Sequence, residues 1–187
     1  MFSHLKSEVK LNMKTTGIVR RIDELGRVVI PKEIRKTMRL KEGEELEVFV
    51  NDEETLVLKK YSTIKSFKEL AKEYVEVLYK HTGYNCLITD TDEVIAAAID
   101  KSAYEGKRIT KTFENFLRSR KSAYLRGQDA FKITLESEYK DMVVSPLVVG
   151  GDCIGSIALI SEKGIVGGEN VLKLLEVGAS FFVNRIE

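Results

Sequence analysis

Basic side chains are concentrated between residues 14 and 41, where nine Lys and Arg residues stand against three acidic ones. Residues 42–54 reverse this balance, with seven acidic residues and no basic one. Lysine and arginine neutralise phosphates, and the planar fork of arginine can donate two parallel hydrogen bonds to a phosphate or to a guanine edge. Basic clusters in general more often occupy solvated faces. The pattern nevertheless makes binding of a nucleic-acid backbone the chemistry to test.

The elements that must position these cations form a compact β-β-α-β-β unit over residues 13–62. The segment from Asp23 to Gly26 has the residue types of a turn, because glycine readily takes the positive φ that many turns need. Pro31 suits the first position of a helix, since its missing N–H would have had no helical partner there. The expected elements are strands over 18–22 and 27–30, a helix over 31–38, and strands over 46–50 and 55–59.

A unit of this size is at the lower limit of what can bury its own core. A helix shorter than ~12 residues is marginal in water, and small domains bury a low fraction of their surface. We therefore expect an obligate dimer in which two copies pair strands with each other.

The run from Gly17 to Arg35, with Asp23-Glu24-Leu25-Gly26-Arg27 and Ile30-Pro31-Lys32 inside it, resembles the swapped-hairpin DNA-binding domain of the AbrB family of transition-state regulators. The resemblance implies binding to double-stranded DNA, with readout partly of DNA shape and flexibility. Its contact positions fall on Arg20, Arg27 and Arg35, and Arg21 and Lys36 also match basic positions of the motif.

Residues 63–82 predict one long amphipathic helix that links this unit to a second domain. Apolar residues recur every three or four positions from Ile64 to Leu78. Ser66 and Glu69 fit a capping box, and Gly83 fits the stop.

Residues 83–187 then predict an α/β sensor domain with a central antiparallel sheet. The expected strands cover 86–89, 94–99, 131–136, 142–149 and 153–161, and the expected helices cover 111–121 and 168–185. This order, with the Gly150-Gly151 hairpin, resembles a GAF-type domain, and a PAS-type sheet fits nearly as well. Many such domains hold a small effector. No effector can be named from the sequence, no cofactor is expected, and the domain could serve chiefly for assembly.

Enzymatic readings find little support in the sequence. No phosphate-cradling loop, nucleophile elbow or catalytic histidine arrangement is present. Cys86 and Cys153 lack metal-ligand spacing and lie in apolar strands, so we expect reduced core thiols and no metal. Some GAF-like proteins are thiol redox enzymes, and the N-terminal fold also occurs in antitoxins that grip a toxin protein. Both stay open as alternatives.

The sequence as a whole predicts an α+β DNA-binding transcriptional regulator without catalytic activity. The resemblance implies activation and repression of sporulation genes by a homotetramer that joins N-terminal dimers through C-terminal domains. We expect a cytoplasmic, nucleoid-associated protein, because the chain contains neither a signal peptide nor a membrane-spanning apolar run. Residues 1–12 are expected to be a disordered extension.

Overall fold

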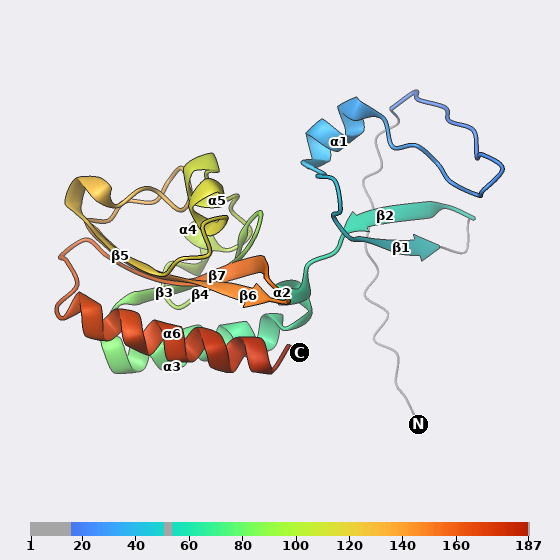
Figure 1. Ribbon diagram of the computed structural model, residues 1–187. Coiled ribbons are helices and arrows are strands. Elements are labelled where there is room, and N and C mark those ends of the chain that lie inside the picture. Colours follow the sequence, from blue (N-terminus) through green and yellow to red (C-terminus); the bar gives the residue numbers. More distant parts are fainter. Residues whose placement is uncertain (1–15, 51–53, 187) are drawn as a thin grey trace. The chain divides into compact units, whose positions relative to one another are not determined.

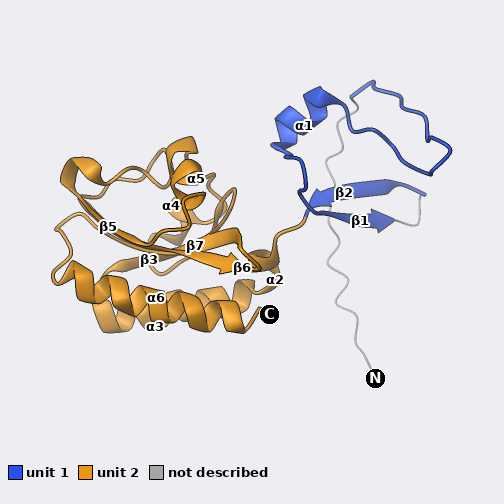
Figure 2. Ribbon diagram, in the orientation of Figure 1, with its two compact units in different colours: residues 1–60 blue, residues 61–187 orange. Residues whose placement is uncertain are grey.

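The computed structural model describes residues 16–50 and 54–186, and the chain divides into two compact units (Figure 1, Figure 2). Unit 1 comprises residues 1–60, and unit 2 comprises residues 61–187. The predicted extension over residues 1–12 lies outside the described residues. The mixture of helices and antiparallel sheets confirms the predicted α+β class.

The described residues of unit 1 form one short helix and one two-stranded sheet. The helix, α1, spans Lys32–Met38 and follows Pro31, whose φ is −58°. The strands β1 (Leu46–Val50) and β2 (Leu56–Lys60) pair antiparallel. The prediction for β1 is confirmed residue for residue, whereas β2 begins and ends one residue later than predicted.

The predicted strands over 18–22 and 27–30 are wrong for the single chain, because residues 16–30 contain no strand. They form an extended open loop around a turn, which Figure 1 shows in blue before α1. Each strand needs a neighbour to accept its backbone hydrogen bonds, and within one chain these two segments meet only at the turn. The turn itself is present where the sequence predicted it.

Unit 2 is built on a five-stranded antiparallel sheet with the order β4-β3-β7-β6-β5. Helices α3 (Lys68–Thr82) and α6 (Gly168–Asn184) lie side by side on one face, and α4 (Lys101–Tyr104) and α5 (Lys111–Leu117) lie over the other (Figure 1). The strands are β3 Asn85–Asp90, β4 Val94–Ala97, β5 Ala123–Arg126, β6 Asp141–Val149 and β7 Asp152–Ser161.

Each face of this sheet has its own apolar core, because side chains alternate along a strand. In β3, Cys86 and Ile88 pack with the residues of α3 and α6, including Phe182. Leu87 points into the opposite core, which contains Phe113 of α5. The buried strands explain why β3, β6 and β7 read as nearly continuous apolar runs in the sequence.

The predicted single helix over 63–82 is divided at Phe67 into α2 (Thr63–Ser66) and α3. The predicted capping box of Ser66 and Glu69 is wrong, because Ser66 is the last residue of α2, and α3 begins after Phe67 without a side-chain cap. Ser62 instead caps α2 by accepting a hydrogen bond from the Lys65 N–H. The Ser62 hydroxyl also donates to the buried Asp90 carboxylate at 2.9 Å, so α2 is tied to the sheet. The predicted stop at Gly83, with φ 72°, is confirmed.

The predicted strand over 131–136 is also wrong. This segment forms a loop whose one β-bridge in the described residues joins Thr134 to Ile109, and its Ile133 is buried in the apolar core on that face of the sheet. The Tyr139 hydroxyl binds the backbone of Phe131 and Ile133 and holds the loop in place. The edge strand is β5 instead, which is short and only half-buried, so its apolar pattern in the sequence is weak.

Candidate nucleic-acid interface

The turn of unit 1 is held by one carboxylate. Asp23 accepts hydrogen bonds from the Leu25 N–H at 3.0 Å and from the Arg27 N–H at 2.8 Å. Gly26 completes the turn with φ 75°. The hydrogen bond from the Arg27 backbone is the largest cause that lowers the pKa of Asp23, and the hydrogen bond from the Arg27 side chain is the second. The turn is therefore closed by an ionised side chain at neutral pH.

The same carboxylate orients Arg27. Its Nε lies 2.8 Å from Oδ2 of Asp23, while 70% of the Arg27 side chain remains exposed. The terminal nitrogens of the guanidinium are consequently available to a ligand, and the side chain starts from a fixed position. A pre-positioned cation loses less conformational freedom on binding.

A second group of cations lies on α1 and its C-terminal cap. Lys32, Arg35, Lys36 and Arg39 are all exposed. Positions separated by three, four and seven residues share one face of a helix. Arg39 has φ 54°, and the Leu40 N–H bonds to the carbonyl of Arg35, which ends the helix in a left-handed cap. This short helix presents one basic face.

The five predicted DNA-contacting residues fall on three segments of unit 1. Arg20 and Arg21 lie in the extended segment before the turn, Arg27 directly follows it, and Arg35 and Lys36 belong to α1. All five are exposed, and only Arg27 pairs with a carboxylate of the described residues. Lys32 and Arg39 were not singled out from the sequence, although their helical spacing with Arg35 and Lys36 was a signal for them.

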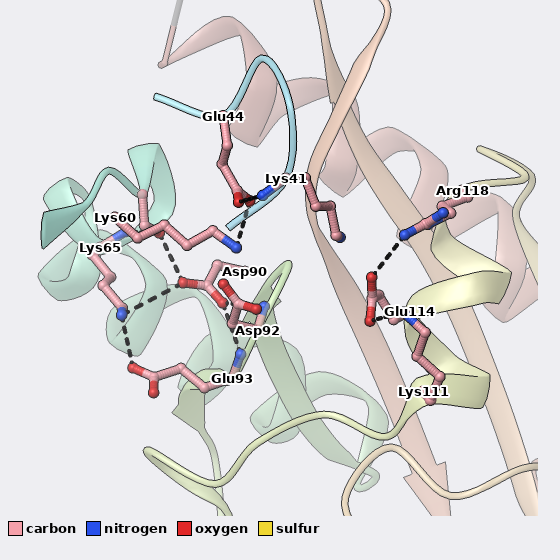
Figure 3. Close-up of polar contacts among 11 residues, drawn as sticks. Lys41, Glu44, Lys60, Lys65, Asp90, Asp92, Glu93, Lys111, Glu114 and Arg118 are labelled. Carbon is pink, nitrogen blue, oxygen red and sulfur yellow. Dashed lines mark hydrogen bonds and ion pairs between the residues drawn. The ribbon is translucent and has the colours of Figure 1, made fainter. Parts of the chain in front are cut away.

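The acidic segment after α1 is partly neutralised inside unit 1. Glu44 accepts a hydrogen bond from the Lys41 N–H at 2.8 Å and forms an ion pair with Lys60 of β2 (Figure 3). Lys59 lies 4.7 Å from the centroid of the Phe49 ring across the two-stranded sheet. The ion pair with Lys60 therefore ties Glu44, one residue of the acidic segment, to the two-stranded sheet.

Unit 1 also exposes an unusual amount of apolar surface around the turn. Val19 is 85% exposed and Val29 is 71% exposed, and their neighbours are similarly uncovered: Ile22, Leu25 and Val28. Contiguous exposed apolar surface marks an interaction site. These side chains come from the same segments that lack strand partners.

Unit 2 offers little that resembles a catalytic or metal centre. Over residues 16–50 and 54–186, no group of His, Cys, Asp and Glu side chains is arranged to hold a metal ion. Burial raises the pKa of the Cys86 thiol, and burial also raises that of Cys153, which is only half-buried. Neither thiol has the lowered pKa of a reactive cysteine. No helix in the described part of the chain is long and apolar enough to cross a membrane.

Comparison with known proteins divides the chain in the same two parts. Residues 66–187 match the family described as stage V sporulation protein T C-terminal, transcription factor. Residues 19–66 match a family described as antidote-toxin recognition MazE, bacterial antitoxin. The chain is 59% identical over 49 residues to the transition state regulatory protein AbrB of Bacillus subtilis, which covers 26% of this chain and 50% of that protein.

Unit 2 has the GAF fold. The structure of the GAF domain from an Acinetobacter phosphoenolpyruvate-protein phosphotransferase matches 68% of this chain and 84% of that chain with a TM-score of 0.55. The sequence identity is 10%, so the likeness concerns the fold alone. The expectation of a GAF-like domain with a central antiparallel sheet is confirmed.

One relative matches the two parts together. Stage V sporulation protein T of Bacillus subtilis is 39% identical over 178 residues, which cover 94% of this chain and 99% of that protein. A match of this extent includes the AbrB-type segment, the linking helices and the GAF-type unit in one alignment. The chain therefore belongs to the stage V sporulation protein T family.

Proposed function

We propose that the protein is a DNA-binding transcriptional regulator of sporulation genes, which both activates and represses transcription. The observation that carries this function is the basic face of α1 together with the preceding turn, whose arginine is held by Asp23. It lies in the segment that is 59% identical to the transition state regulatory protein AbrB. The protein acts in the cytoplasm at the nucleoid and is not an enzyme.

The contacts to double-stranded DNA come from Arg20, Arg21, Arg27, Arg35 and Lys36. Their exposure supports this assignment, because a phosphate or a base edge can reach each of them. Arg27 is held at the turn and suits a bidentate contact. Lys32 and Arg39 extend the same basic face of α1 and add to the attraction for the phosphate backbone.

The regulator works as an assembly of copies. The exposed apolar side chains around the turn, such as Val19 and Val29, support a dimer in which the loop segments pair with those of a second copy. On α6, Leu174, Val177 and Phe181 are 44%, 70% and 53% exposed at spacings of three and four residues. This stripe supports joining of dimers into a homotetramer through unit 2. Two linked dimers raise the effective concentration at neighbouring DNA sites.

The match of residues 19–66 to an antitoxin family favours a second candidate function, in which the chain grips a toxin protein. Unit 2 has two apolar cores of its own, one on each face of its sheet. A segment that folds around its own core leaves little unpaired apolar chain for wrapping a toxin. Transcriptional regulation therefore remains the better supported function.

The deciding experiment measures binding of the full chain to duplex genomic fragments by fluorescence anisotropy across a series of salt concentrations. Wild type is compared with Arg27→Ala and with Arg27→Lys, and Lys121→Ala in unit 2 is the matched control. Each phosphate contact contributes about 0.9 to the slope of log affinity against log salt. Arg27→Ala should reduce the slope by about 1.8 in a dimer with two such contacts.

Arg27→Lys should keep most of that slope and lose discrimination between fragments, because lysine retains the charge without the planar fork. Lys121→Ala should bind as wild type does. Absence of salt-sensitive binding by wild type would reject the DNA-binding function. Equal slopes for wild type and Arg27→Ala would reject the assignment of Arg27.

A further inference from the structure

A hollow of about 600 Å³ lies within unit 2, where β5, the start of β6 and the loop before α6 meet. Its size is within the range of small-molecule sites. The lining includes Tyr124, Arg126, Lys140, Asp141, Lys163 and the loop over 164–168. It contains none of the residues assigned above to DNA binding or to assembly.

The charge of this lining is unbalanced. Arg126, Lys140 and Lys163 face one carboxylate, that of Asp141, and none of the three cations forms an ion pair with a described residue. Asp141 is already engaged: its Oδ2 accepts hydrogen bonds from the Tyr124 hydroxyl at 3.0 Å and from the Ile165 N–H at 2.9 Å. Among the described residues, the hollow therefore carries three cations that no carboxylate pairs with directly.

The loop that closes the hollow is fixed. The Val166 N–H donates to the Tyr84 hydroxyl at 2.9 Å, in addition to the bond between Ile165 and Asp141. A Cβ at Gly168 would lie 2.0 Å from the Tyr124 ring, so the loop can approach that ring only with glycine there. A wall held in this way loses little conformational freedom when a ligand binds.

Among the described residues, the centre of the other face of the sheet is tightly packed. Phe113, Ile133 and Met142 fill it and are each 0% exposed. The hollow lies at the edge of the sheet, beside β5 and the start of β6. Its chemistry is that of an anion site, because cations give charge-assisted hydrogen bonds to phosphate oxygens.

We propose that this hollow binds a small phosphate-bearing molecule through Arg126, Lys140 and Lys163. Asp141 and Tyr124 are positioning residues, since they hold the loop and not the anion. Arg126 lies with its guanidinium carbon 5.6 Å from the centroid of the Tyr124 ring, which keeps it beside the hollow.

The test is equilibrium dialysis of the full chain against radiolabelled inorganic phosphate, with sodium chloride keeping the ionic strength constant. Wild type should bind about one phosphate per chain saturably. Lys163→Met and Lys140→Met should each weaken binding about tenfold, as expected for one charge-assisted contact at an open site. The matched control is Lys173→Met, an exposed lysine of α6 outside the hollow, which should bind as wild type.

Competition identifies the source of the phosphate. Adenosine monophosphate should displace the label, whereas duplex DNA should not. Lack of saturable phosphate binding by wild type would overturn the proposal, and so would equal losses in Lys163→Met and Lys173→Met. Displacement by duplex DNA and not by adenosine monophosphate would overturn it as well, because the hollow would then be a docking point for a nucleic-acid backbone.

Discussion

Asp141→Asn is the substitution that most directly tests how the loop before α6 is held. The side chain of Asp141 is buried at the start of β6, and one of its oxygens accepts hydrogen bonds from Tyr124 and Ile165. Asparagine has nearly the same shape and can keep both hydrogen bonds through its carbonyl oxygen. The substitution therefore removes the negative charge and little else.

The magnitude follows from the two hydrogen bonds. A hydrogen bond to a charged partner contributes roughly 1.5–3 kcal/mol to stability, and a neutral one roughly 0.5–1.5 kcal/mol. Loss of the charge at both bonds should lower the free energy of unfolding of unit 2 by about 2 kcal/mol. For a domain of this size each kcal/mol changes the melting temperature by roughly 4 °C, so the expected decrease is about 8 °C.

The substitution should also change the response to acid. Burial raises the pKa of Asp141, but the hydrogen bonds from Ile165 and Tyr124 outweigh burial and hold the pKa below its usual value. The native state thus binds this proton less readily than the unfolded chain does. The stabilisation is complete above the unfolded pKa of about 3.9 and is lost as the pH falls below it toward the native pKa.

The assay is thermal unfolding of the full chain by circular dichroism between neutral and acidic pH. The control is Asp129→Asn, an exposed carboxylate that makes no side-chain hydrogen bond or ion pair with the described residues. Asp141→Asn should melt lower than the control at neutral pH and should lose less stability below pH ~4. Equal melting temperatures of Asp141→Asn and Asp129→Asn at neutral pH would refute the stabilising role of the Asp141 charge. An equal dependence of melting temperature on pH below pH ~4 would refute it as well. Tyr124→Phe in both backgrounds should show a coupling energy of about 1 kcal/mol.

Three further predictions concern other parts of unit 2. Phe182→Ala should destabilise the fold by about 3–5 kcal/mol in urea unfolding, because its ring is fully buried. Substitution of its exposed neighbour, Phe181→Ala, should keep the fold and yield a smaller assembly in sedimentation. An unchanged sedimentation coefficient would contradict the role of the α6 stripe in assembly. Gly155→Ala should cost about 1–3 kcal/mol, since its Cβ would lie 2.1 Å from a carbonyl oxygen of β3, and an unchanged urea midpoint would contradict that contact. In native protein an aromatic disulfide reagent should react with the half-buried Cys153 much faster than with Cys86, and similar rates would show that β3 opens readily.

Local chemistry made several elements predictable. Pro31 and the left-handed glycine at Gly83 mark a helix start and a helix stop through backbone sterics alone. The late hairpin over β6 and β7 was predicted because two apolar runs flank Gly150 and Gly151. Elements that depend on distant contacts were less predictable. The half-buried strand β5 was missed, and residues 131–136 alternate like a strand but are held as a loop by Tyr139.

The residues of the candidate nucleic-acid interface were more predictable from the sequence than the contacts that position them. The five cations were named from a motif, and each of them is exposed. The bracing of Arg27 by Asp23 joins residues four apart and could have been inferred from turn chemistry. The pairing of Lys60 with Glu44 joins two segments sixteen positions apart, which no local pattern indicates.

The sequence by itself determined the family, the two-part organisation with its basic N-terminal segment, and most strands and helices, because these depend on motifs and on periodicity along the chain. Only the tertiary structure decided the break at Phe67 and the hollow at β5 and β6. Two buried carboxylates hold the segments next to these features through partners distant in sequence. Ser62, which caps α2, is 28 positions from Asp90, and Ile165, in the loop at the hollow, is 24 positions from Asp141. A buried carboxylate must find hydrogen-bond donors, and which donors lie within reach is fixed only when the sheet has folded.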